Sequence, residues 1–265
     1  MKKYLLIITD EFQRHLAYRA NITAYSIGHI IDVSAQVIIW SVIFSQVSII
    51  KGYTLTEMMT YVVFGWFFQH ASSNYNFEER VARDIERGTL SSLLIKPISY
   101  LRYITACAIG RVGFAFATVW GIAVILLLLM HDRLIFNFNP IILLIILIMV
   151  VIGFFIKLLF SLIIGLFAIW VVEISGTYFS LNIIAKFLSG AMFPIALLPS
   201  FFINLTLLFP FAYTLFVPLQ LYLGKISIYQ GVIGVGVELV WLIILYGIVK
   251  LIWHFGLKKY ESVGI

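Results

Sequence analysis

The sequence predicts an all-α integral membrane protein with six transmembrane helices. Of its 265 residues, 62% are hydrophobic and 11% are charged, whereas roughly a quarter of the residues in an ordinary soluble domain are charged. A helix of roughly 20 apolar residues crosses the hydrocarbon core of a bilayer, so the chain has room for about six such helices with short connections. This leaves no room for a separate water-soluble catalytic domain, and residues 1–265 are expected to form one transmembrane domain.

The first 21 residues predict a helix that lies in the membrane interface. Its apolar residues recur at intervals of three and four, and they are Leu5, Ile8, Phe12 and Leu16. Charged and polar residues fill the positions between them, which is typical of an amphipathic interfacial helix. The apolar run 4–9 is short for the core of a signal peptide, so we expect residues 1–21 to be retained.

Six apolar segments predict the transmembrane helices. Their approximate ranges are 22–47, 56–77, 103–130, 140–172, 175–194 and 229–254. The fourth segment begins at Pro140, which suits the first turn of a helix, and it is long enough that it must tilt or extend past the bilayer.

The connection between the fifth and sixth segments is apolar but rich in proline. It contains Pro194, Pro199, Pro210 and Pro218. Because proline interrupts a helix, this connection predicts short broken or re-entrant helices on one side of the membrane. A seventh span over 201–217 is the alternative.

The distribution of basic residues predicts the orientation. Most Lys and Arg outside the spans lie in the N-terminal segment, in 78–102 and in the C-terminal tail, and the other connections hold Lys51, Arg133 and Lys225. Lys and Arg collect in cytoplasmic loops, so both termini and the region 78–100 are predicted to face the cytoplasm. This placement requires an even number of spans, which disfavours the seventh.

The region 78–100 combines dense mixed charge with a short apolar patch. Charged helix formers precede Gly88, a plausible helix terminator, and Thr89 can cap a following turn. The patch before Pro97 consists of Leu90, Leu93, Leu94 and Ile95. We therefore expect two short helices joined at Gly88, the second of which can press an apolar face into a groove of a partner. A solvated loop explains the arginines equally well, but it explains the patch only if these residues rest on the bilayer surface.

The segment IERGTLSSLLIKPISYL, residues 85–101, resembles the G-x-L-x-x-L-L-x-x-P-hydrophobic signature of the ABC-2 type permease family. These permeases are the six-span membrane subunits of ATP-binding-cassette exporters, and the chain is similar to their short single-domain branch. The amphipathic N-terminal segment, the charged loop after the second span and the connection SGAMFPIALLP extend the resemblance over the chain. Many members carry an acidic residue where this chain has Ser91, so no family role is expected there.

The resemblance implies that 78–100 is a coupling region that sits in a groove of a separate ATPase subunit and transmits closure of the ATP-bound dimer to the spans. The residues that match the family pattern are Glu78, Glu79, Arg83, Asp84, Gly88, Leu90, Leu93, Leu94 and Pro97. A second permease chain, identical or related, is also implied. ATP and magnesium would be bound by the ATPase subunit, with no cofactor in this chain. The resemblance places the protein in the plasma membrane of a prokaryote.

The residues themselves offer no catalytic set. The chain has no G-x-x-x-x-G-K-[ST] motif, no H-E-x-x-H motif and a single cysteine, and its five histidines are scattered. We therefore predict that it is not an enzyme, and its positive charge is attributed to cytoplasmic loops rather than to nucleic-acid binding. The alternatives are a secondary transporter driven by an ion gradient, although no inverted repeat is evident, and a membrane-embedded enzyme or assembly factor.

Several ionisable residues fall inside the predicted spans. They are Asp32, Arg111, Lys157, Lys186 and Glu238. Each would cost roughly 2.5 to 3.5 kcal/mol at the bilayer centre, so they are expected to face the bundle interior, water or one another. Arg111 can extend to the cytoplasmic interface. The other four predict either structural ion pairs, such as Asp32 with Lys186, or a polar lining of the substrate path. In a secondary transporter, Asp32 and Glu238 would be the ion sites.

Overall fold

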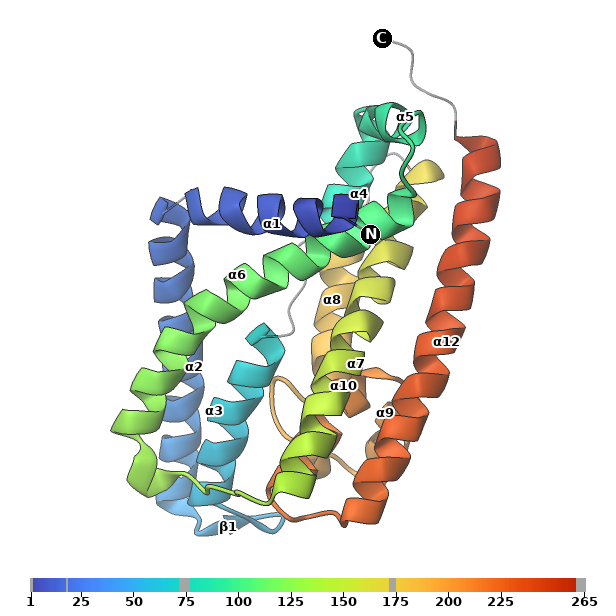
Figure 1. Cartoon of the computed structure of the whole chain (residues 1–265). Coiled ribbons are helices and arrows are strands. Elements are labelled where there is room, and N and C mark those ends of the chain that lie inside the picture. The colour runs from blue at the N-terminus through green and yellow to red at the C-terminus, as the bar shows by residue number, and fades with distance from the viewer. Residues whose placement is uncertain (1, 18, 72–76, 172–174, 261–265) are drawn as a thin grey trace.

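The computed structural model describes residues 2–17, 19–71, 77–171 and 175–260. In these ranges the chain forms a bundle of long helices with a small antiparallel hairpin at one end (Figure 1). Figure 1 shows α1 lying across the opposite end of the bundle, close to α4 and α5. We name these two ends the β1 end and the α5 end.

Six helices form the body of the bundle, and α1 (Lys2–Ala17) precedes them. These six are α2 (Arg19–Gln46), α3 (Leu55–Ala71), α6 (Tyr100–Leu129), α7 (Pro140–Leu166), α8 (Ser175–Ser189) and α12 (Ile228–Lys259). At the α5 end, α4 (Phe77–Glu86) and α5 (Thr89–Leu94) connect α3 to α6. At the β1 end, β1 (Ile49–Ile50) pairs with β2 (Tyr53–Thr54) between α2 and α3.

Four helices of the described residues are long and apolar enough to cross a membrane. They are Ser26–Gln46, Tyr100–Leu129, Pro140–Ile169 and Ile228–Lys259. The helices α3 and α8 occupy the positions of the two other expected spans, but they are 17 and 15 residues long. The helical membrane architecture is therefore present, and the count of six spans stays a prediction.

The helix expected over 175–194 ends earlier, at Ser189. Gly190 has a φ of +78°, and the next amide, that of Ala191, donates to the Lys186 carbonyl at 3.1 Å. A residue in the left-handed region with this six-to-one hydrogen bond is a common helix terminator, and it stops α8 before Pro194 is reached. The sequence predicted that this helix extends to Pro194, but the residue that ends it is Gly190.

Other helices also differ from their predicted ranges. The second span was expected to extend to residue 77, but α3 is described to Ala71 and Phe77 begins α4. The expected fourth span, 140–172, is α-helical to Leu166 and then tightens into a 3-10 turn, η2 (Phe167–Ile169). The last helix was expected over 229–254 and continues to Lys259. Its start is set by a capping box, in which Ser227 and Gln230 satisfy each other's backbone N–H groups.

The proline-rich connection between α8 and α12 consists of short helices. They are η3 (Ile195–Leu197), α9 (Ser200–Leu207), α10 (Phe211–Thr214) and α11 (Phe216–Tyr222). The continuous helix over 201–217 that a seventh span requires is absent, because the chain turns after Leu207 and leaves helical geometry at Leu215, whose φ is −145°.

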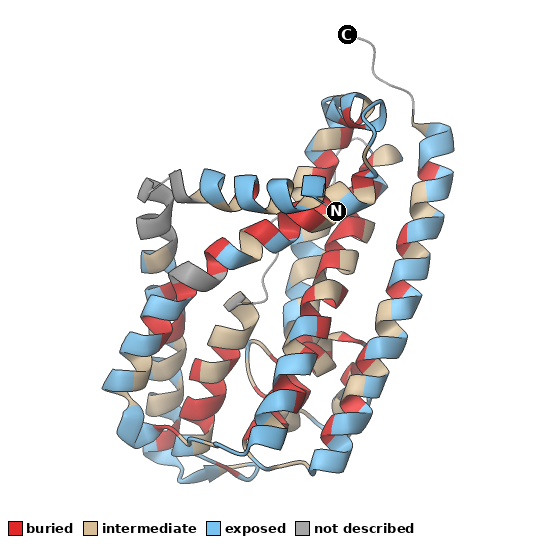
Figure 2. Cartoon of the chain, in the orientation of Figure 1, coloured by how far each residue is buried: buried red, intermediate tan, exposed pale blue. Residues whose placement is uncertain are grey.

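The core is centred on α7, which packs against α12, α4, α10 and α11. Figure 2 shows that the buried residues concentrate on the inner faces of the bundle, whereas much of α2 and α12 is exposed. These exposed faces are apolar and include Ile38, Ile39 and Ile243. Lipid tails are as apolar as such side chains, so an apolar outer surface is expected of helices that face a bilayer.

Candidate functional site

The two short helices after α3 meet at Gly88. Its φ of +71° lies in the left-handed region, which glycine adopts without the clash that a Cβ atom would introduce. Gly88 is itself the N-cap of α5, and no side chain caps that helix, so Thr89 does not have the capping contact that the sequence suggested. The chain therefore turns sharply between α4 and α5 at a residue suited to the turn.

One face of α4 is buried against the body of the bundle. Its buried residues are Phe77, Glu78, Val81, Ala82 and Ile85. The contact with α7 is close at Gly165, where an added Cβ atom would lie 2.6 Å from Val81 Cβ and 2.7 Å from the Glu78 carbonyl oxygen. Small residues allow helices to approach this closely, so α4 is packed as part of the bundle.

The charged residues of α4 fall into two groups. Glu79 and Arg83 form an ion pair of 3.4 Å on the outer face. Glu78 is buried and its Oε1 accepts a hydrogen bond of 2.8 Å from Asn182 Nδ2 on α8. Asp84 accepts a hydrogen bond of 3.0 Å from the Tyr100 hydroxyl, and burial raises its pKa above the ordinary value. Glu78 and Asp84 therefore attach α4 to neighbouring helices, whereas Glu79, Arg83 and the exposed Glu86 lie on its outer face.

The apolar residues in and after α5 also divide into a buried group and an exposed group. Leu90 and Leu93 are 0% and 7% exposed and belong to the core cluster that includes Ile104 and Leu158. Leu94 is 40% exposed and the following Ile95 is 86% exposed. We name residues 94–97, which end at the exposed Pro97, the coupling tip.

The sequence predicted one apolar patch of Leu90, Leu93, Leu94 and Ile95, and the residues that match the family pattern include the three leucines but not Ile95. Leu90, Leu93 and Leu94 are spaced by three and four, which predicts one apolar face but not whether that face packs inward or outward. Only the tertiary structure separates Leu94 and Ile95 from the other two.

The helix α1 is attached to this region at several points. Glu11 on α1 and Arg80 on α4 are 2.5 Å apart, and Arg80 also contacts the Tyr103 hydroxyl at 3.4 Å. Burial opposes ionisation of Glu11, but hydrogen bonds with His15 and Arg80 outweigh it and lower the pKa of Glu11 to about 2. Lys3 donates to the Pro97 carbonyl. These contacts, which sequence patterns did not reveal, tie α1 to both ends of the α4–α5 unit.

The C-terminal end of α12 also reaches α5. The hydroxyls of Ser91 and Tyr260 are 3.1 Å apart. Ser91 therefore has a structural contact, although no role was expected at this position.

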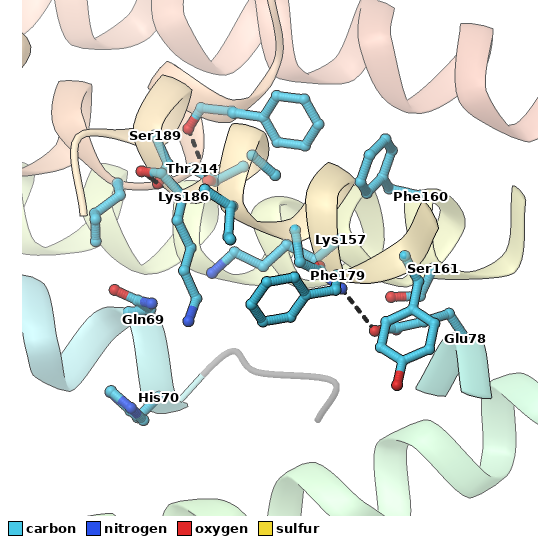
Figure 3. A pocket seen from close by; sticks show the side chains of 16 residues that line it. Gln69, His70, Glu78, Lys157, Phe160, Ser161, Phe179, Lys186, Ser189 and Thr214 are labelled. Atoms are coloured by element: carbon cyan, nitrogen blue, oxygen red, sulfur yellow. Dashed lines mark hydrogen bonds between the residues drawn. The ribbon is translucent and has the colours of Figure 1, made fainter. Parts of the chain in front are cut away.

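A cavity of about 390 Å³ lies beside α4, between α7 and α8, and the end of α3 and the short α10 complete it (Figure 3). Lys157 extends into it from α7 and Lys186 from α8 (Figure 3). Glu78 and Asn182 lie at its α4 side, and His70 contributes from α3. The cavity therefore directly adjoins the first turn of α4.

The four residues predicted to form ion pairs or to line the substrate path do not form one network. Lys157 and Lys186 line the cavity. Asp32 lies 4.0 Å from His70, and it forms no ion pair with Lys186. Glu238 is fully buried and interacts electrostatically with Lys157 from α12. Lys157 thus lines the cavity together with Lys186, and it also interacts electrostatically with Glu238.

Within the described ranges, no group of three His, Cys, Asp or Glu side chains is placed to hold a metal ion. The single cysteine, Cys107, is a buried free thiol whose Sγ lies 3.5 Å from Arg80. The described part of the chain therefore has three candidate functional features: the exposed tip, the packed helix α4 and the cavity lined by two lysines.

The chain matches a known protein family. The family described as ABC-2 family transporter protein matches residues 30–264. No curated protein and no solved structure matches. The matched range includes the coupling tip and every residue that lines the cavity, and it leaves out α1.

Proposed function

Because the chain belongs to the ABC-2 transporter family, we propose that it is the membrane-spanning permease subunit of an ABC exporter. A separate nucleotide-binding subunit binds and hydrolyses ATP with magnesium, and a second permease chain, identical or related, completes the pathway. In this proposal the protein crosses a prokaryotic plasma membrane six times, with its termini and α5 end in the cytoplasm. The family assignment favours this reading over an ion-driven secondary transporter.

The observation that carries the proposal is the exposed coupling tip at the end of a fastened helix pair. Ile95 is 86% exposed beside Leu94, although the neighbouring Leu90 is completely buried. A buried isoleucine side chain contributes roughly 1.5 to 3 kcal/mol, so docking of Ile95 in a groove can change an affinity by roughly 10-fold to 100-fold. An apolar projection of this kind is suited to a groove in a partner protein.

The helix α4 then carries the motion of the tip into the bundle. It has ten residues, so it is about 15 Å long. Its last turn adjoins α5, and its first turn places Glu78 in the lining of the cavity. In the proposed mechanism, closure of the ATP-bound subunits pushes on the tip, and α4 passes that displacement to the cavity.

Co-purification with the ATPase subunit tests this proposal. The variant Ile95→Asp is expected to abolish co-purification without affecting the elution of the permease in detergent, because the side chain is already in water. The matched control is Ile49→Asp, since Ile49 is 57% exposed at the β1 end. Normal retention of the ATPase by Ile95→Asp would overturn the assignment of the tip.

Cysteine labelling tests the orientation separately. Because the native Cys107 is buried, a cysteine introduced at an exposed position can be labelled selectively. A membrane-impermeant maleimide added to intact cells is expected to label Ile49→Cys but not Ile95→Cys. The reverse pattern would place the coupling tip outside the cell and exclude contact with a cytoplasmic ATPase.

A further inference from the structure

The cavity beside α4 contains two lysines from adjacent helices. Lys157 and Lys186 both line it, and Glu78 is the acidic residue of its lining (Figure 3). Glu78 Oε1 already accepts the hydrogen bond from Asn182. No ion pair of the described residues includes Lys186. Two lysines against one glutamate leave the described lining with a net positive charge that a ligand can meet.

Lys157 interacts electrostatically with a carboxylate that lies outside the cavity lining. Glu238 on α12 is 0% exposed, and in the described part of the chain neither of its carboxylate oxygens has a hydrogen-bond partner. Its charge acts on Lys157, but Glu238 itself does not line the cavity. Of the two lysines, Lys157 therefore interacts with a carboxylate outside the cavity lining, and Lys186 forms no ion pair with a described residue.

The rest of the lining suits an apolar group. Phe160, Phe179, Phe211 and Ile183 face the same cavity. Its volume of about 390 Å³ lies in the range of pockets that bind small molecules, which are mostly apolar with a few polar groups that fix orientation. Two cations beside aromatic side chains are complementary to a molecule that has one anionic end and one hydrocarbon end.

We propose that this cavity binds an amphiphilic anion, whose phosphate or carboxylate head group lies between Lys157 and Lys186 and whose hydrocarbon contacts the phenylalanines. The inference rests on the proposed function in one respect, that this ligand is the transported substrate. Hydrogen bonds to charged groups are the strong ones, so the head group supplies both the orientation and much of the selectivity.

Binding is measured on the permease alone, in nanodiscs of neutral phosphatidylcholine, by native mass spectrometry. The probes are dodecyl phosphate, dodecyltrimethylammonium and inorganic phosphate. Wild-type protein is expected to retain dodecyl phosphate in preference to the other two. Preference for the ammonium probe would overturn the anionic assignment, and equal retention of inorganic phosphate would overturn the amphiphilic one.

Variants locate the site. Lys186→Gln is expected to weaken retention of dodecyl phosphate roughly tenfold or more, since it removes a charged hydrogen-bond donor, whereas Lys186→Arg retains binding. Lys250→Gln is the matched control, because Lys250 is an exposed lysine of α12 outside the cavity lining. Unchanged binding by Lys186→Gln would overturn the proposed site.

Lys157 requires a paired substitution, because Lys157→Gln alone would leave Glu238 buried without its opposing charge. The double variant Lys157→Gln/Glu238→Gln removes both charges, and it is expected to bind dodecyl phosphate more weakly than wild type. Unchanged binding by a double variant that elutes as wild type does would remove Lys157 from the site.

A competition experiment determines whether the natural anion is a bilayer lipid or another amphiphile. Phosphatidylglycerol added to the nanodiscs displaces dodecyl phosphate if the natural ligand is a bilayer lipid, and it leaves dodecyl phosphate bound if the ligand is another amphiphile. Either result supports the anionic site and assigns its source.

ATP hydrolysis by the assembled complex separates the two proposals. If the permease binds dodecyl phosphate but never co-purifies with an ATPase, the proposed function fails and the anion site stands. If the complex forms and hydrolyses ATP but dodecyl phosphate neither binds nor stimulates it, the anion site fails and the proposed function stands.

Discussion

The variant Gly165→Ala tests whether α4 is held directly against α7. An added Cβ atom would lie 2.6 Å from Val81 Cβ and 2.7 Å from the Glu78 carbonyl oxygen, and both atoms belong to α4. Ordinary contacts begin at 3.4 Å, so α4 must move away by about 0.8 Å, the difference between 2.6 Å and 3.4 Å. The carbonyl cannot rotate away as a side chain can, which makes relief without helix movement difficult.

Two opposing effects determine how much Gly165→Ala changes the free energy of unfolding. Overpacking of a closely packed contact costs about 1 to 3 kcal/mol. Alanine in place of glycine inside a helix recovers about 0.5 to 1 kcal/mol. The matched control is Gly247→Ala in α12, where no heavy atom lies within 4 Å of the added Cβ and only the second term acts. The difference in unfolding free energy between the two variants is therefore expected to be about 1 to 3 kcal/mol.

Unfolding of both variants in the same detergent is the assay. Gly165→Ala is expected to unfold more readily than Gly247→Ala, and its complex with the ATPase is expected to hydrolyse ATP with weaker coupling to transport. Equal stability of the two variants would show that α4 does not lie against α7 as described. Loss of stability with normal coupling would instead remove α4 from the proposed path of transmission.

Two further substitutions address the turn and the attachment of α1. Gly88→Ala places a Cβ in the left-handed region, at a cost of about 1 to 2 kcal/mol. Thermal unfolding is expected to show this loss and a smaller one for Gly88→Asn, since asparagine tolerates that region. Glu11→Gln is expected to lower stability at neutral pH. Because folding lowers the pKa of Glu11 from 4.5 to about 2, the ionised carboxylate contributes its full stability above pH 4.5 and loses it as the pH falls toward 2. Unfolding measured from pH 7 to pH 3 should therefore bring wild type closer to Glu11→Gln, and a constant difference would exclude this carboxylate as the cause.

The long apolar helices could be predicted, because an uninterrupted run of about 20 apolar residues is typical of a transmembrane helix. Helix ends that depend on the backbone angle of one residue could not be predicted. The end of α8 is an example, because the positive φ of Gly190 is indicated in the sequence only by the glycine itself. The turn at Gly88 was expected because charged helix formers precede the glycine and apolar residues follow it. Gly190 stands in an apolar stretch, where no such change marks the end of the helix.

The candidate site was predictable in its location but not in the roles of its residues. Sequence spacing placed Leu90 and Leu93 on the face of α5 that would bind a partner, but both are buried in the permease itself. Glu78 was assigned to an outer docking surface, but it lines the cavity and accepts a hydrogen bond from Asn182, which is 104 positions away in the sequence. Local patterns cannot reveal such contacts because both partners look like ordinary polar residues.

The inward packing of those residues supports the proposed coupling, because it holds α4 and α5 firmly against the bundle. A loop whose apolar residues all faced a partner would be attached to its own chain only through the backbone, and a push would bend it. Here Leu90 and Leu93 anchor α5 in the core, and Val81 holds α4 on α7. Interiors packed in this way transmit displacement because they compress little. In the proposed mechanism, Leu94 and Ile95 bind the partner, and the buried residues transmit the displacement toward Glu78 and the cavity.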